Sequence, residues 1–336
     1  MSRIEVLPGL STSSYRRHLL HGDDMAWVEK NCYSDLWIAL LHTLDLEPCA
    51  LLPFALAVDF EGDQWTFFKP SLEELRDLYG IDVQELTVWR PLIDHAVEHL
   101  SAGKLISTEA DAFWLPDTAG TDYRTKHSKT TIVLATLDVQ ARQLGYFHNA
   151  GYFELSGEDF SRIFHLDESL DPAFLPLFAE LVRVDRLVKR PLAELAARSF
   201  DLLRRHFDRR PAVNPFKAFN RRFAQDLPEL QAAGLPRYHA WAFASIRQAG
   251  TAFELAAVNL RWQAGFGNPG LTASAACFDS IAQANKALIL KGARAVNSGR
   301  PFDANPLISE MARAWDEGMD LLARCLSRAS EVRHRI

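Results

Sequence analysis

The chain has 336 residues, of which 48% are hydrophobic and 24% charged, and its formal net charge is −6. This composition is typical of soluble globular proteins, and the length favours two domains. The negative charge argues against nucleic acid as a partner. The four cysteines form no CxxC pair and no zinc-ligand spacing, so we expect neither a disulfide scaffold nor a metal site. Residues 1–20 lack the apolar core of a signal peptide and no apolar run could span a bilayer, so we expect a cytoplasmic protein without a membrane partner.

The first half of the chain predicts a mixture of helices and strands. A buried helical pattern over 35–44 follows Cys32 directly. The apolar run 51–60 predicts a strand, and the turn residues 61–63 lead into a second strand over 64–68. Further helices are expected at 71–80 and 90–102, and further strands at 104–107, 130–137, 144–147 and 152–155.

The second half is dominated by helical periodicity from about residue 164. Six helices are predicted, at 171–187, 190–207, 214–232, 236–265, 271–298 and 304–330. We therefore predict an α+β fold with two domains. Residues 1–165 would form a papain-like domain with an antiparallel sheet, and residues 166–336 a helical domain.

One cysteine and one histidine stand where thiol enzymes place their reacting groups. Cys32 lies at the start of the predicted helix, after the polar residues 29–31, and His127 lies at the start of a β-branched strand. A helix N-terminus is expected to lower a thiol pKa, and an imidazole can accept the thiol proton. We therefore predict Cys32 as the nucleophile and His127 as the base. The alternatives are a buried structural cysteine and an exposed loop histidine.

A third group is expected to orient the imidazole. Asn149 follows the strand after the one that His127 opens, and antiparallel pairing of these strands would return it to His127. Asp138 closes the far end of the first strand and Asp122 lies on a loop, so we favour Asn149 over both. His148 is an alternative base, in which case His127 would be structural.

Other residues are candidates for binding. Asn31 and Gln64 are candidate oxyanion donors from their polarity and position. Between Arg183 and Arg222 there are twelve Lys or Arg residues against four Asp or Glu, which predicts either a docking surface for an acidic partner or a solvated helix face. The partner-binding candidates within this region are Arg204, Arg205, Arg209 and Arg210.

Four segments resemble an uncharacterised bacterial family, a domain of unknown function, over nearly the whole chain. They are NCYSDLWI (31–38), DFEGDQWTFFKP (59–70), YGIDVQEL (79–86) and GYFHNAGY (145–152). Genes of that family are often found near amino acid:carrier protein ligases, which implies such a ligase or its carrier protein as a partner.

More remotely, the layout is similar to the butirosin-biosynthesis acyltransferase family, through Cys32 before a helix and His127 before a strand. The resemblance implies an acyltransferase that moves an aminoacyl or acyl group from the phosphopantetheine thioester of an acidic carrier protein to an amine. It implies no bound cofactor. The chain departs from such folds at residues 148–150, where His-Asn-Ala replaces an Asp-Pro. A cysteine peptidase or amidase and a non-catalytic scaffold that binds the carrier or ligase are the alternatives.

Overall fold

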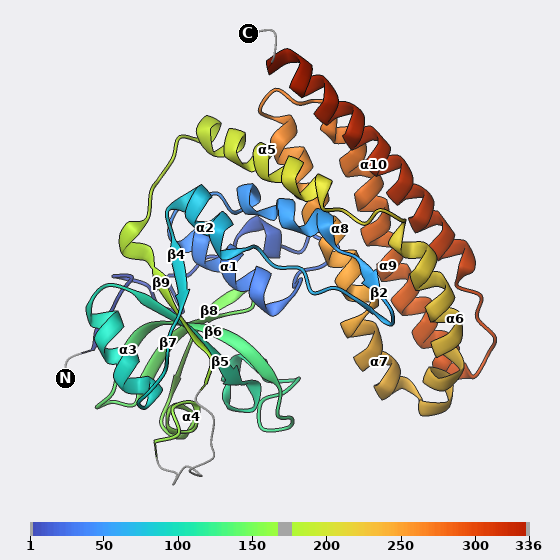
Figure 1. The fold of residues 1–336 in the computed structure, drawn as a ribbon. Helices are drawn as coiled ribbons and strands as arrows, with labels where there is room; N and C mark the ends of the chain where they lie inside the picture. Colours follow the sequence, from blue (N-terminus) through green and yellow to red (C-terminus); the bar gives the residue numbers. More distant parts are fainter. Residues whose placement is uncertain (1–2, 167–176, 334–336) are drawn as a thin grey trace. The chain divides into compact units, whose positions relative to one another are not determined.

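The computed structural model describes residues 3–166 and 177–333, which form two compact units interleaved along the chain (Figure 1). The sheet unit comprises Met1–Gly22, Asn31–Pro48 and Leu72–Arg190. The helical unit comprises Asp23–Lys30, Cys49–Ser71 and Pro191–Ile336. The chain therefore returns to the sheet unit at Asn31, one residue before Cys32.

The sheet unit contains a seven-stranded sheet in the order β4-β9-β5-β6-β7-β8, with β1 beside β6. Each of these strand pairs is antiparallel. The strands are β1 (Ile4–Glu5), β4 (Asp82–Glu85), β5 (Leu105–Asp111), β6 (Lys129–Asp138), β7 (Gln143–His148), β8 (Gly151–Ser156) and β9 (Ala179–Arg183). The predicted α+β class and antiparallel sheet are confirmed.

Short helices surround this sheet. They are α1 (Cys32–Thr43), α2 (Leu72–Tyr79), α3 (Leu92–Ser101) and α4 (Glu158–Ile163), with the 3-10 turns η1 (Leu19–His21), η3 (Ala112–Trp114), η4 (Pro116–Thr118) and η5 (Val184–Arg186). The helices expected after Cys32 and over 71–80 and 90–102 are confirmed. Helix α1 packs against β6, β7 and β8, which brings its first residue to the sheet.

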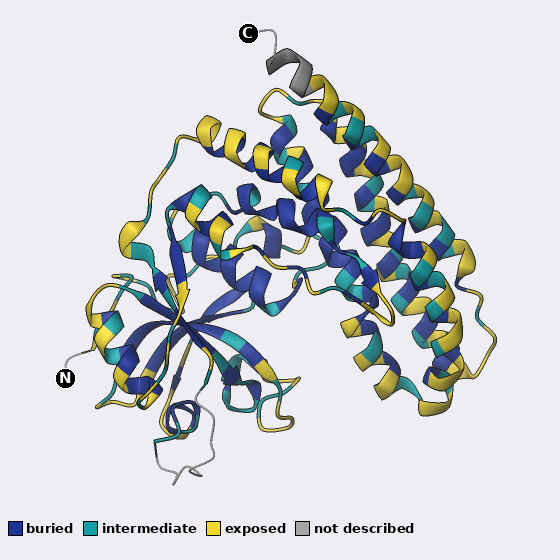
Figure 2. Cartoon of the chain, in the orientation of Figure 1, coloured by how far each residue is buried: buried dark blue, intermediate teal, exposed yellow. Residues whose placement is uncertain are grey.

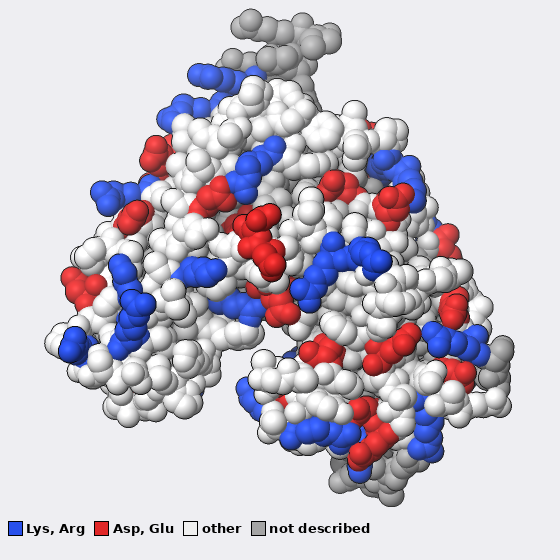
Figure 3. Space-filling view, turned by 180° about the vertical axis from the view of Figure 1, so that it is seen from behind, with Lys and Arg blue, Asp and Glu red and all other residues white. Residues whose placement is uncertain are grey.

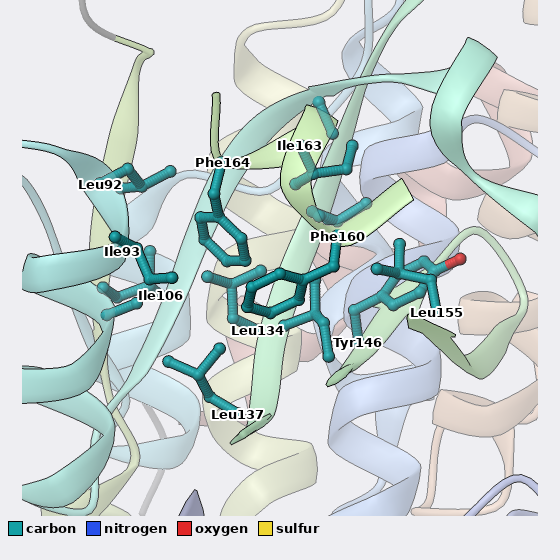
Figure 4. Close-up of a cluster of buried hydrophobic side chains, with 14 of the residues drawn as sticks. Leu92, Ile93, Ile106, Leu134, Leu137, Tyr146, Leu155, Phe160, Ile163 and Phe164 are labelled. Atoms are coloured by element: carbon teal, nitrogen blue, oxygen red, sulfur yellow. The ribbon is translucent and has the colours of Figure 1, made fainter. Parts of the chain in front are cut away.

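A hydrophobic core holds α3 and α4 against the sheet (Figure 4). Leu134 and Tyr146 from neighbouring strands meet Phe160 of α4 and Ile93 of α3 in this cluster. Each is less than a tenth exposed. Burial of one packed face therefore fixes the register of the central strands. The same packing fixes the positions of the strand ends, which carry polar residues.

Two predicted elements are wrong, for a common reason. The helix expected over 171–187 contains strand β9 instead, which pairs with both β4 and β5; residues 171–176 lie outside the described residues. The strand expected over 51–60 is mostly the 3-10 helix η2 (Pro48–Ala57), and only Phe60 begins a strand. Short apolar runs satisfy helical and strand patterns equally well, so tertiary pairing decides between them.

The helical unit is built from six helices in its described part. They are α5 (Leu192–Asp208), α6 (Pro215–Ala233), α7 (Leu235–Ala244), α8 (Ile246–Ala264), α9 (Leu271–Ser298) and α10 (Asn305–Arg333), preceded by η2 and the hairpin β2 (Phe60–Glu61) and β3 (Gln64–Trp65). Of the expected hairpin, only the part next to the turn is present, where Phe60–Glu61 pairs with Gln64–Trp65. The single helix expected over 236–265 is broken at Ser245, between α7 and α8.

Helices α5, α9 and α10 carry buried residues along one side and exposed residues along the other, whereas α8 is buried over most of its length (Figure 2). The segment Asp23–Lys30 is anchored among them by Glu254 of α8, which accepts from the backbone N–H groups of Ala26 (2.7 Å) and Trp27 (3.2 Å). The buried ammonium of Lys30 lies 3.8 Å from the same carboxylate. In the part of the chain that the structure describes, no helix combines the length and apolar character needed to cross a membrane.

Candidate active site

The site begins at the N-terminus of α1. Asn31 adopts an extended backbone conformation, and its side-chain oxygen accepts a 2.8 Å hydrogen bond from the backbone N–H of Ser34. This is the geometry of an N-cap, which ends the preceding extended segment and starts the helix at the next residue. Cys32 is thus the first helical residue, as the sequence predicts. Asn31 is occupied as the cap, which is a different use of its side chain from the oxyanion donor expected above.

The thiol of Cys32 is half-buried, and burial raises its pKa. The hydroxyl of Thr130 lowers the pKa because it can donate to the thiolate form, and the negative charge of Asp35 raises the pKa further. The backbone N–H groups of Tyr33 and Thr131 also favour the thiolate. The sequence-based expectation of a lowered thiol pKa is therefore wrong, because desolvation outweighs the donors at the helix N-terminus. A proton acceptor is needed to ionise this thiol near neutral pH.

A chain of hydrogen bonds begins at the Thr130 hydroxyl, which acts on the pKa of this thiol. That hydroxyl lies 2.8 Å from Nε2 of His148. Nδ1 of His148 lies 2.6 Å from one carboxylate oxygen of Asp117, and the hydroxyl of Tyr146 donates to the other oxygen at 2.5 Å. Imidazole, hydroxyl and carboxylate are thus linked in the order used for proton transfer in nucleophilic enzymes.

Burial distinguishes this chain of groups from ordinary surface polar contacts. His148 is 1% exposed, Thr130 is 9% exposed and the side chain of Asp117 is 3% exposed. Burial foremost, and the neighbouring Asp117 next, raise the pKa of Tyr146, so its hydroxyl keeps its proton and remains a donor to Asp117. Because the Asp117 carboxylate accepts from Nδ1–H, Nε2 of the neutral imidazole is left as the acceptor.

The position of Asp117 is set by the loop between β5 and β6. Leu115 is fully buried, and Pro116 starts the short turn η4 after it. The hydroxyl of Thr118 donates to the backbone carbonyls of both Ala112 and Leu115, at 2.9 Å each. These contacts close the loop, so Asp117 is held beneath the end of β7.

His127, the predicted base, lies in a different environment. Its side chain is 70% exposed, its ring stacks on Phe113 with centroids 4.4 Å apart, and its Nδ1 lies 2.5 Å from Asp111. The residue near Cys32 on this strand is Thr130, three positions further along the chain. The histidine that is hydrogen-bonded to Thr130 and to a buried carboxylate is therefore His148, the alternative base of the sequence analysis.

The remaining sequence candidates occupy other positions. Asn149 is the first residue of the two-residue turn between β7 and β8, with a φ of 45° that asparagine tolerates well. The partner of the His148 imidazole is Asp117 rather than this neighbour. Gln64 is exposed on β3 of the helical unit. Asp122 accepts from the hydroxyl of Ser128, and Asp138 accepts from the backbone N–H of Ala141.

The basic stretch 183–222 spans both units. Several of its cations form ion pairs with carboxylates, among them Arg183 with Asp185, Arg186 with Asp82, Lys189 with Asp45, Arg198 with Glu194 and Arg222 with Asp226. Of the four arginines singled out by the sequence, Arg205 and Arg209 are exposed near the end of α5, Arg204 is half-buried, and Arg210 lies over the ring of Phe207. Figure 3 shows Lys and Arg interspersed with Asp and Glu on the face it views.

The residues that sequence reasoning missed are Thr130 and Asp117. Neither carries a motif: Thr130 is one of several β-branched residues at the start of a strand, and Asp117 lies in a loop rich in turn-forming residues. In the described residues, no group of three or more His, Cys, Asp or Glu side chains is arranged to hold a metal ion.

Fold and site together define a two-part α+β protein with a half-buried cysteine at a helix start and a buried hydrogen-bond chain of threonine, histidine and aspartate. The comparison with protein families then places it. Residues 16–184 match the DUF1839 N-terminal domain and residues 192–324 match the DUF1839 C-terminal domain, so the chain belongs to this family, a domain of unknown function. No match to the chain was found among curated proteins.

Proposed function

We propose that this protein is a thiol-dependent acyl-transfer enzyme in which Cys32 is the nucleophile and His148, oriented by Asp117, moves the proton. The observation that carries the proposal is the buried hydrogen-bond chain from Thr130 through His148 to Asp117, which begins at the hydroxyl that acts on the pKa of the Cys32 thiol. A cysteine at the start of a helix that packs on an antiparallel sheet, with the histidine on that sheet, is also the layout of papain-like enzymes.

The reaction follows from the chemistry of these groups. The sulfur of Cys32 attacks the acyl carbonyl of a thioester, its proton passes to His148, and that proton then leaves with the departing thiol. An amine next attacks the acyl-enzyme, His148 accepts the amine proton, and the bond from the acyl carbon to Cys32 breaks with return of the thiol. A thioester is already activated, so the main requirements are positioning and a thiolate formed at the moment of attack.

The donor that we propose is the aminoacyl or acyl phosphopantetheine of an acidic carrier protein, in line with the resemblance stated in the sequence analysis. The exposed residues Arg205 and Arg209 are the sites proposed for docking that protein. If they dock an acidic surface, the double substitution of both by Glu weakens turnover of the carrier-bound donor and leaves turnover of the free pantetheine thioester unchanged. Equal effects on both donors would remove the docking role.

The test of the nucleophile uses intact-protein mass after incubation with aminoacyl-pantetheine thioesters. We expect a mass gain equal to the aminoacyl group in the wild type, no gain in Cys32→Ala, and formation slowed by about 10²- to 10⁴-fold in His148→Asn. His127→Asn is the matched control, because this histidine is also paired with an aspartate, and we expect its rate to stay within about threefold of the wild type.

The outcomes separate the alternatives. An adduct that transfers to an added amine supports the transferase, whereas an adduct that decays equally fast in water alone indicates a hydrolase. No adduct with any of a panel of thioesters, from folded protein, would overturn the proposal. The raised pKa of Cys32 would then fit a non-catalytic scaffold.

A further inference from the structure

We propose that the hydroxyl of Thr130 is a catalytic group that carries the proton between the thiol of Cys32 and the imidazole of His148. This inference rests on the proposed function and adds a residue to it. In papain-like enzymes the imidazole receives the thiol proton directly, whereas here the Thr130 hydroxyl lies 2.8 Å from Nε2 of the imidazole and acts on the pKa of the thiol.

The hydrogen-bonding capacity of the Thr130 hydroxyl determines how it can pass a proton between the thiol and the imidazole. A threonine hydroxyl has one proton to give and lone pairs to accept with, so its two hydrogen bonds are coupled. When His148 is neutral, with Nδ1–H bonded to Asp117, Thr130 donates to Nε2 at 2.8 Å and accepts from the thiol of Cys32. When the imidazole carries a proton on both nitrogens, Nε2–H donates to Thr130, and Thr130 donates to the thiolate.

The step between these two states balances without any further reactant. The S–H bond of Cys32 breaks as an O–H bond forms on Thr130, while the original O–H bond of Thr130 breaks as an N–H bond forms on Nε2 of His148. One proton leaves sulfur and one arrives at nitrogen. Thr130 ends as the same alcohol with a different proton, so it is regenerated in the same step.

The surroundings favour a relay at this position. Thr130 is 9% exposed and is held by the pairing of β6 with β5, where it lies opposite Ala110. A β-branched side chain has few rotamers, so the hydroxyl stays aligned between its partners. Because the thiol is desolvated, the hydroxyl of Thr130 and the N–H groups of Tyr33 and Thr131 replace water as donors to the thiolate.

The experiment measures alkylation of Cys32 by iodoacetamide, followed by mass spectrometry of the peptide that contains it, across the neutral to alkaline range. Thr130→Val is nearly isosteric but lacks the hydroxyl, whereas Thr130→Ser keeps it. At neutral pH we expect alkylation to fall by about 10²-fold in Thr130→Val and to stay within about threefold of the wild type in Thr130→Ser. In strongly alkaline solution, where the thiol ionises without help, the rates of all three proteins should converge.

The double variant tests whether Thr130 acts through His148. If it does, Thr130→Val combined with His148→Asn is alkylated no more slowly than the slower single variant, because both changes break the same chain. Multiplied effects would overturn the relay, and so would a Thr130→Val rate close to wild type or a Thr130→Ser rate as low as that of Thr130→Val.

Failure of the relay and failure of the proposed function are distinguishable. Alkylation needs no thioester, so the relay is tested even if no acyl donor is found. A Thr130→Val protein that is alkylated and acylated at wild-type rates removes the relay and leaves Cys32 as the nucleophile. If the Thr130→Val protein does not fold, the relay is tested on the wild type by measuring the alkylation rate of Cys32 at several deuterium fractions of the solvent. Transfer of two protons in one step gives a curved plot of rate against deuterium fraction, and a linear plot overturns the relay.

Discussion

Two histidines of the sheet unit are paired with aspartates through Nδ1, yet their surroundings differ sharply. His127 with Asp111 lies at the surface, with 70% of the histidine side chain exposed and a phenyl ring stacked on it. His148 with Asp117 is almost completely buried, and its second nitrogen faces the Thr130 hydroxyl and, through it, Cys32. The comparison teaches that a His–Asp pair becomes a candidate catalytic pair through what its free nitrogen reaches and how dry that position is.

The largest expected effect comes from substituting the aspartate of each pair. In Asp117→Asn the amide no longer holds Nδ1–H of His148 as a carboxylate does, so Nε2 is no longer reliably the acceptor. We expect alkylation of Cys32 and acyl-enzyme formation to slow by about 10²- to 10⁴-fold at neutral pH. In Asp111→Asn, the matched control, both rates should stay within about threefold. Equal losses in the two variants would contradict the assignment of the buried pair.

A smaller effect concerns stability. Tyr146→Phe removes the donor to the second oxygen of Asp117 and leaves a buried carboxylate with fewer hydrogen bonds. We expect the free energy of unfolding to fall by about 1–3 kcal/mol, measured by urea denaturation. His127→Ala removes an exposed side chain and should change the same quantity by no more than about 0.5 kcal/mol. Similar losses for the two variants would show that the buried network contributes no more than the surface pair.

The smallest expected effect is on the pH dependence of stability, and it comes from the Cys32 thiol near the buried pair. Because burial raises the pKa of Cys32, the folded protein keeps the thiol proton to higher pH than the unfolded chain, which loses it near pH ~8.5. Above that pH the unfolded state binds fewer protons, so the free energy of unfolding falls as pH rises until the folded thiol also ionises.

The measurement compares the wild type with Cys32→Ala by urea denaturation over a series of pH values. The two stability curves should run parallel below pH ~8.5 and diverge above it, with the wild type losing stability relative to the variant. The buried tyrosines are present in both proteins, so their ionisation cancels in the difference. Curves that stay parallel into strongly alkaline solution would contradict a desolvated thiol.

Much of the local structure near Cys32 could be predicted from the sequence. The polar residues before Cys32 and the buried pattern after it indicate a helix start, and the structure places the N-cap at Asn31. The strands after His127 were also predictable, and their antiparallel pairing brings the end of β7 to the start of β6 as expected. These features depend on neighbouring residues, because capping and alternation are local effects.

The partners of the imidazole were harder to predict. Asp117 and His148 are separated by 31 positions and Thr130 and His148 by 18, and a register shift between Leu134 and Thr136 changes the pairing along β6 and β7. One residue of shift reverses which side chains share a face. Spacing along the chain therefore left His127, Asn149 and His148 as alternatives.

The sequence by itself determined the family, the α+β class and the helix that begins at Cys32, because these follow from residue patterns that a chain carries wherever it folds. Only the tertiary structure decided that strand β9 completes the sheet, that burial raises rather than lowers the thiol pKa, and that His148 rather than His127 is buried and bonded to Thr130. Desolvation and hydrogen-bond partners depend on which distant segments pack together, and that packing is a property of the folded chain.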